Sequence, residues 1–101
     1  MARDAVSWEA ELGWEATEAA ARLTEAFERR GWQVERPSAE VLETAPAGAR
    51  LSVQLTPLPP RQLGATVRLP RCQLRASATG DAAQVALLRE AVRMALLRGG
   101  G

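Results

Sequence analysis

The chain has 101 residues, of which 47% are hydrophobic, and its 13 arginines and 12 acidic residues leave a net charge of +1 at pH 7. This length fits one small domain with a single core. A charge near zero gives no general attraction to nucleic acid or to an acidic membrane, and no apolar run approaches the roughly 18 residues of a membrane span. We therefore expect one soluble domain over residues 1–98, followed by a flexible glycine tail at residues 99–101.

Several reactive residue types are missing from the chain. It contains no His, Lys or Tyr and a single cysteine, Cys72, which lies on the inward side of its predicted strand and is expected to be a small apolar residue of the core. His and Lys are the usual groups for acid–base and Schiff-base chemistry at neutral pH, and His or several Cys usually hold transition metals. No glycine-rich loop follows a strand, which argues against nucleotide binding. We therefore expect no catalytic, cofactor-binding or metal-binding residues, and the protein is not expected to be an enzyme.

The composition also indicates a compartment. A lone cysteine cannot form an internal disulfide, which fits a reducing environment, and the absence of a signal-peptide pattern favours the cytoplasm. Lys, Asn, Ile and Tyr are all absent while Ala, Arg and Gly are abundant, which is typical of a GC-rich genome. The exclusive use of Arg is therefore weak evidence for phosphate recognition.

In the first half of the chain, the spacing of apolar residues changes once, from the alternation of a strand to the period of a helix. Residues 5–15 alternate and predict a half-buried strand, and a single long helix from Ser7 to Arg30 is the less favoured alternative because Gly13 would lie inside it. A helix is then predicted from a cap at Thr17 to about Arg30, with Gly31 after its end. The inward face of the strand carries Val6, Trp8, Ala10, Leu12 and Trp14.

The middle of the chain indicates three strands in succession. A second strand starts at Trp32, a third is expected from Ala39 to Thr44, and the alternation from Leu51 to Thr56 predicts a fourth. The Pro-rich segment from Thr56 to Pro60 is predicted to be a stiff loop. The less favoured alternative is a polyproline-type ligand, which its Pro-Leu-Pro-Pro-Arg run superficially resembles.

The last part of the chain predicts one strand and one helix. Residues 63–76 alternate, and because their apolar phase slips at Pro70 we expect a bulge in one long strand. Thr79 and Gly80 are predicted to form a turn. Asp81 then caps a helix that runs to about Arg98, with Gln84 three residues after the cap in a capping-box arrangement.

Together these elements give the order β-α-β-β-β-β-α. The usual solution is an α+β fold with a curved, mostly antiparallel sheet and both helices packed on one face. A right-handed crossover makes the second strand parallel to the first, so the fifth strand is antiparallel to the first and can pair with it. The order resembles the helix-grip and TATA-binding-protein-like topologies, but the resemblance covers no motif and implies no function.

The two halves of the chain carry opposite charge. Residues 1–43 hold ten acidic side chains and five arginines, whereas residues 44–101 hold eight arginines and two acidic side chains. Pairing of the first and fifth strands would place acidic and basic side chains side by side. Any arginine left unpaired would be free for an anion or nucleic-acid contact, although this face lacks aromatic side chains on which bases could stack. The side chains concerned are Glu9 and Glu11 on the first strand and Arg68, Arg71 and Arg75 on the fifth.

The last helix is apolar over an unusually wide arc, and two stripes can be distinguished on it. We expect the first stripe to face the sheet, while the second either contacts the first helix or forms a self-association surface or the lip of an apolar groove. The sequence thus favours a binding or assembly domain that forms a homodimer. The alternatives are a binder of a small apolar ligand between the sheet and this helix, and a weak nucleic-acid binder through the Arg-bearing face. The first stripe is Val85, Leu88, Val92 and Leu96, and the second is Leu87, Ala91, Met94 and Leu97.

Overall fold

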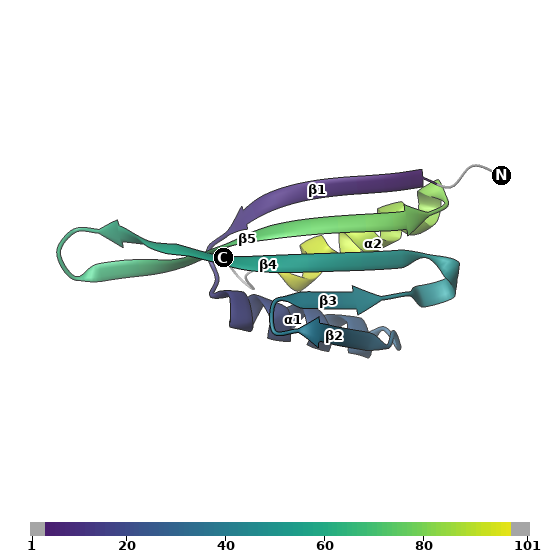
Figure 1. The fold of residues 1–101 in the computed structure, drawn as a ribbon, viewed down its shortest axis with the longest axis horizontal. Helices are drawn as coiled ribbons and strands as arrows, with labels where there is room; N and C mark the ends of the chain where they lie inside the picture. Colours follow the sequence, from purple (N-terminus) through teal and green to yellow (C-terminus); the bar gives the residue numbers. More distant parts are fainter. Residues whose placement is uncertain (1–3, 98–101) are drawn as a thin grey trace.

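The computed structural model, which describes residues 4–97, has the predicted α+β architecture and the predicted element order. Five strands form one open sheet, and both helices lie against the same face of it, behind the strands in Figure 1. No helix in the described part of the chain is long and apolar enough to cross a membrane. The strands are β1 (Asp4–Leu12), β2 (Val34–Ser38), β3 (Val41–Thr44), β4 (Arg50–Leu63) and β5 (Val67–Gly80), and the helices are α1 (Ala16–Arg29) and α2 (Ala82–Ala95).

The order of strands in the sheet is β1-β5-β4-β3-β2, and every neighbouring pair is antiparallel. The predicted pairing of the first and fifth strands is confirmed, because β1 pairs with β5 along its whole length, from Asp4 opposite Gly80 to Leu12 opposite Cys72. The edges of the sheet are therefore β1 on one side and β2 on the other.

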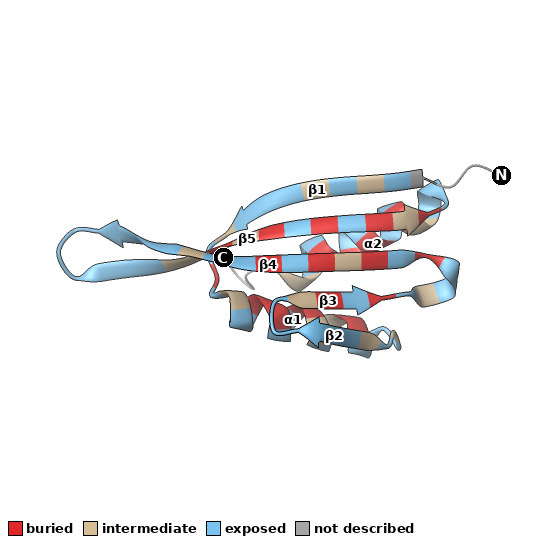
Figure 2. Cartoon of the chain, viewed as in Figure 1, coloured by how far each residue is buried: buried red, intermediate tan, exposed pale blue. Residues whose placement is uncertain are grey.

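The core lies between the sheet and the two helices. Alternate residues of β4 and β5 are buried (Figure 2), as expected for strands with one face on the core and one face open. The first predicted stripe of the last helix faces this core, since Val85, Leu88 and Val92 are buried. Cys72 and Trp14 are also buried as predicted, whereas Trp8 and Trp32 are only partly covered. The residues that α1 buries are Ala19, Ala20, Leu23 and Phe27.

The helix ends match the predictions in part. The α2 capping box is confirmed: the Gln84 amide N–H donates to Asp81 Oδ1 at 2.8 Å, and the Asp81 amide N–H donates to Gln84 Oε1 at 3.1 Å. The cap of α1 is Glu15 rather than the predicted Thr17, because the Glu15 carbonyl already accepts the first helical bond, from Ala19. The structure ends α2 at Ala95 instead of near residue 98, and the predicted glycine tail lies outside the described residues.

The largest difference from the prediction concerns the Pro-rich segment. Residues 56–60 belong to β4 rather than to a loop, and the turn between β4 and β5 lies at residues 64–66. Proline lacks a backbone N–H and is tolerated where a strand has a neighbour on one side only. That condition is met here, because the register of β3 on β4 reaches no further than Gln54. Thr79 and Gly80, expected as a turn, are likewise the last residues of β5.

These two extended strands form a hairpin, residues 57–72, that we call the arm. It projects beyond the rest of the sheet at the left of Figure 1, in a molecule measuring 55 × 29 × 24 Å. The prediction of one long strand through Pro70 is confirmed. The bulge expected there lies on the opposite strand, because β4 advances three residues from Leu58 to Arg61 while β5 advances two, from Arg71 to Leu69.

Candidate interaction surfaces

Two of the three predicted arginine contacts are paired with glutamates: Arg75 on the open face of the sheet and Arg71 at the base of the arm. Arg75 Nε lies 2.8 Å from Glu9 Oε1, directly across the β1–β5 pair. Arg71 Nη1 lies 2.5 Å from Glu11 Oε1, and its Nε donates to the Pro59 carbonyl at 2.9 Å. The opposite charges of the two halves of the chain therefore neutralise each other across this edge of the sheet.

Arg68 is the exception among the predicted contacts. It lies on the arm opposite Gln62, is exposed, and forms no ion pair with any described residue. Arg61 on the facing strand is also exposed and unpaired within residues 4–97, and sequence reasoning did not single it out. The signal that could have found it is the absence of any Asp or Glu from residues 45–80.

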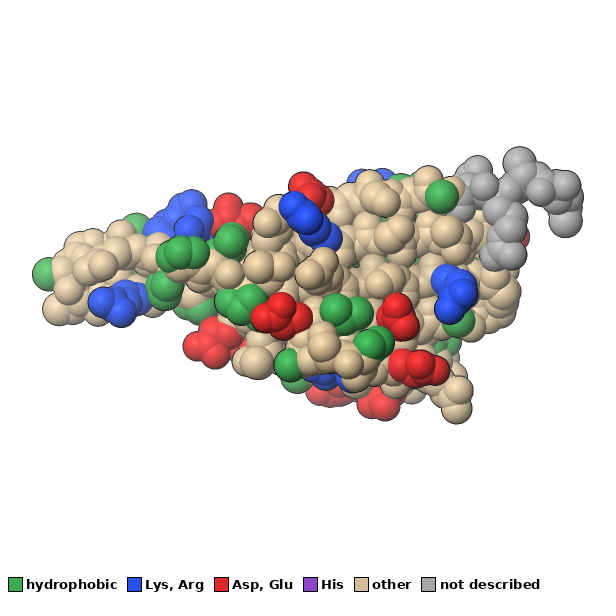
Figure 3. Space-filling model, in the orientation of Figure 1, with side chains coloured by type: hydrophobic (Ala, Val, Ile, Leu, Met, Phe, Trp, Pro, Cys, Tyr) green, Lys and Arg blue, Asp and Glu red, His purple; other side chains and the backbone are tan. Residues whose placement is uncertain are grey.

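The arm also exposes apolar side chains. Leu63, Val67 and Leu69 are 49%, 48% and 44% exposed. Because Leu63 lies opposite Val67 and Arg61 opposite Leu69, two residues away along each strand, these four side chains share one face of the ribbon. Hydrophobic and arginine side chains accordingly gather on the arm in Figure 3. The outer part of the arm, residues 61–69, is therefore an exposed surface of mixed apolar and cationic side chains.

The second stripe of α2 is divided in the structure. Ala91 is buried, whereas Leu87, Met94 and Leu97 are 52%, 50% and 50% exposed. Contact with α1 therefore accounts for only part of the predicted stripe. Three of the four predicted interface residues remain available to a partner.

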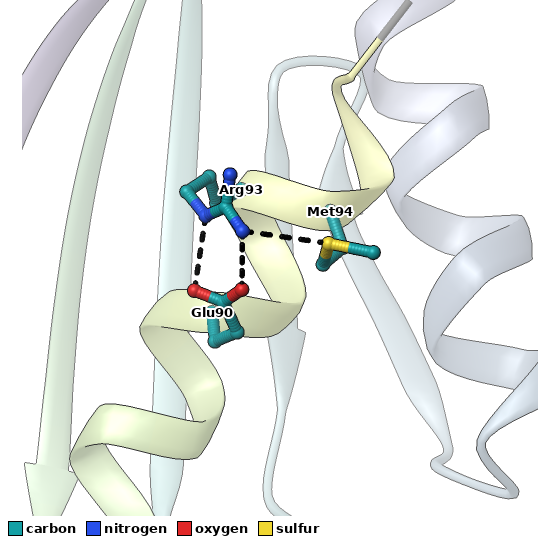
Figure 4. Close-up of polar contacts among 3 residues, drawn as sticks. All are labelled: Glu90, Arg93 and Met94. Carbon is teal, nitrogen blue, oxygen red and sulfur yellow. Dashed lines mark hydrogen bonds and ion pairs between the residues drawn. The ribbon is translucent and has the colours of Figure 1, made fainter. Parts of the chain in front are cut away.

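An ion pair between Glu90 and Arg93 lies beside Met94 on this exposed side of α2 (Figure 4). Arg93 Nε and Nη2 donate to the two carboxylate oxygens of Glu90 at 3.0 Å and 2.5 Å, and Nη2 lies 3.6 Å from Met94 Sδ. The hydrogen bond from Arg93 lowers the pKa of Glu90 below its ordinary value. The pair is therefore ionised at neutral pH and neutralises itself beside the apolar patch.

A groove of about 610 Å³ runs between β1 and α2, and of the four residues predicted for the lip of an apolar groove only Leu97 lines it. Arg89 lies over the Trp8 ring at one side of it, with the guanidinium carbon 5.3 Å from the ring centroid. The walls are largely apolar and include Trp8, Ala10, Leu12, Leu74, Val92 and Leu96.

A second hollow, of about 690 Å³, lies on the open face near β2 and β3, and its walls are polar and apolar in nearly equal measure. Glu35 and Glu43 lie directly opposite each other there, with Arg50 and Trp32 also in the lining. Among the described residues no group of three or more His, Cys, Asp or Glu is placed to hold a metal ion.

The single thiol is in the core as predicted. Cys72 is completely buried, and burial raises the pKa of its thiol. A buried, protonated thiol is a poor nucleophile, so Cys72 packs as a small apolar residue.

Comparison with protein-family models, with curated proteins and with solved structures gives no match for this chain. The structure thus defines the class, a small α+β protein with an open antiparallel sheet.

Proposed function

We propose that the protein is a non-catalytic binding and assembly module that works as a homodimer. The observation that carries this proposal is the amount of apolar surface that the fold leaves uncovered. A small domain gains stability by burying such surface against a partner, and closed two-fold dimers are the commonest way to do so. Six large apolar side chains in the described part of the chain are about half exposed: Leu63, Val67, Leu69, Leu87, Met94 and Leu97.

The oligomeric state tests the proposal directly. Light scattering coupled to size-exclusion chromatography should give twice the monomer mass at micromolar concentrations and a shift toward monomer on dilution. A strict monomer at high micromolar concentration would overturn the homodimer.

The groove between β1 and α2 supports a second candidate function, binding of a small apolar ligand. Its volume of about 610 Å³ lies within the usual range for ligand sites, and its walls are mostly apolar. Native mass spectrometry of the purified protein should then retain a co-purified lipid-like mass. Ala10→Trp, which fills the groove from an exposed position, should abolish that mass, while Ala5→Trp on the opposite face of the same strand should not. Retention of the same mass by Ala10→Trp would place any ligand elsewhere.

A further inference from the structure

The two edges of the sheet differ in how they are protected against pairing with another strand. Edge strand β2 has five residues, contains Pro37, and shifts register on β3 between Glu35 and Ser38. Short length, proline and irregular pairing are three of the features by which natural proteins block their edges, and charged side chains, which both edge strands carry, are another. Edge strand β1 has nine residues, no proline and an unbroken register on β5. Its outer side, at the top of Figure 1, is covered by no described element.

The side chains of β1 also leave the core incompletely closed at this edge. Val6, Trp8 and Leu12 on the helix side are only partly buried, and Ala10 is exposed. On the neighbouring strand β5, the four residues in the equivalent positions, 72, 74, 76 and 78, are all buried. The apolar layer therefore continues to the rim of the sheet instead of ending in polar residues, as a solvated edge would.

The sequence of β1 is complementary to itself in one register. A two-fold axis through Trp8, the middle residue of the strand, pairs all nine residues and keeps the helix faces of both copies on the same side. On the helix side Val6 then lies opposite Ala10 of the second copy. On the open side, Ser7 lies opposite Glu9 of the second copy and Ala5 opposite Glu11, so no like charges meet. Moving the axis by one residue toward the C-terminus would place Glu9 opposite itself, and moving it by one residue toward the N-terminus would place Ser7 opposite itself.

We propose that two copies of the chain pair edge to edge through β1, in the register centred on Trp8, so that their sheets become one continuous antiparallel sheet. This inference rests on the proposed homodimer and names an interface for it at β1, beside which only Leu97 of the six exposed apolar side chains lies, in the lining of the groove. Strand addition at a free edge gives both copies the same new backbone hydrogen bonds, as a two-fold contact requires. The apolar grooves between β1 and α2 then lie next to each other across the axis.

The test changes the charge at Ser7, an exposed residue on the open side whose substitution leaves the core untouched. Ser7→Glu places two symmetry-related pairs of like charges across the interface, and Ser7→Arg places two pairs of opposite charges there. The dissociation constant of the dimer, measured by analytical ultracentrifugation, should rise about 2- to 30-fold for Ser7→Glu and fall by a similar factor for Ser7→Arg.

Ser77 provides the matched control. It lies directly opposite Ser7 on β5, on the same face but one strand further from the axis. Ser77→Glu and Ser77→Arg should leave the dissociation constant nearly unchanged, and hydrogen exchange should show concentration-dependent protection in β1 and none in β2.

The possible outcomes distinguish failure of the β1 interface from failure of the homodimer itself. A wild-type chain that stays monomeric overturns the homodimer and this interface together. A stable dimer that responds equally to the Ser7 and Ser77 variants, or to neither, overturns only the β1 interface. Weakening by both Ser7→Glu and Ser7→Arg would mean that Ser7 lies opposite itself, and would overturn the register centred on Trp8.

Discussion

At the junction of β5 and α2, a single glycine lets the capping box form. Gly80 has φ +152°, and a Cβ placed on it would lie 2.9 Å from Gln84 Oε1 and 3.0 Å from the Cβ of Ala49. The Gln84 side chain is fixed at this point, because its Oε1 accepts from the Asp81 amide while its Nε2 donates to the Ala47 carbonyl at 2.7 Å. The start of α2 and the turn before β4 are thus tied together by one side chain.

We predict that Gly80→Ala lowers the free energy of unfolding by about 1–3 kcal/mol, because it strains the backbone and displaces the cap. Urea denaturation followed by tryptophan fluorescence measures the change. The control is Gly48→Ala, which also has positive φ, +84°, but has no atom within 4 Å of its added Cβ. That variant should lose only about 1 kcal/mol, from the backbone conformation alone. Equal losses for the two variants would mean that the contact with Gln84 contributes nothing.

Cys72 dominates the alkaline pH dependence of stability, because the chain has no Lys, His or Tyr. Burial raises the pKa of the thiol in the folded protein. Below a pH of about 8.5, the ordinary pKa of a thiol, Cys72 is protonated in both states and stability does not depend on it. Above that pH the unfolded chain loses this proton first, so the free energy of unfolding falls as pH rises.

We therefore predict a steady loss of stability from about pH 8.5 upward, which denaturant midpoints at a series of pH values would measure. Cys72→Ala should flatten the profile even though it lowers stability at every pH by leaving a small cavity. A wild-type profile that stays flat in this range would contradict the burial of the thiol.

Among the elements, the arm departs most from ordinary sheet packing. An isolated two-stranded ribbon is marginally stable in water, and residues 61–69 are exposed on both strands. The arm is held at its base, where Arg71 bonds to both Glu11 and the Pro59 carbonyl. Its apolar side chains therefore add little to the stability of the monomer.

Replacing Leu63, Val67 and Leu69 together by Ser should change the free energy of unfolding by no more than about 0.5 kcal/mol per site. Leu55→Ala, in the buried part of β4, should lower the free energy of unfolding by about 2–5 kcal/mol. Chemical denaturation measures both effects at a concentration where the chain is monomeric. A large loss for the triple variant would show that the arm packs onto the body of the protein.

On the scale of the whole molecule, the first strand of the chain pairs with the last strand in the open sheet. The β1–β5 pairing links residues that are 60 to 76 positions apart in sequence. Closing such long loops must precede the contacts that compensate for the lost entropy, and this slows folding.

We predict refolding in the millisecond-to-second range, as for other domains dominated by non-local strand pairs. Stopped-flow fluorescence can follow it, because Trp8 and Trp14 lie in or next to β1. Refolding within microseconds would indicate that local contacts govern the folding of this chain.

Glu9→Ala and Arg75→Ala should each lower the free energy of unfolding slightly, with a coupling energy of about 0.2–1 kcal/mol between them.

Local patterns in the sequence determined much of this structure. Strand β1, helix α1 and the capped start of α2 follow from alternation, from the 3.6-residue period and from capping residues, and each of these signals lies within a few neighbouring residues. The β1–β5 pairing followed from element order and the handedness of crossovers. Together they specified the α+β fold and predicted that acidic side chains of the first strand would lie beside arginines of the fifth.

Only the tertiary structure decided that the Pro-rich segment continues β4, which arginines remain unpaired, and which edge of the sheet is open. A proline can lie in a strand where no second neighbouring strand requires a hydrogen bond from the N–H that proline lacks. Such a neighbouring strand comes from elsewhere in the chain. In the same way, the sequence predicts the same outward position for Arg71 and Arg68 on the fifth strand, but only Arg71 lies within reach of a glutamate on β1. The sequence alone shows which side chains carry charge, whereas long-range pairing decides which of them are neutralised.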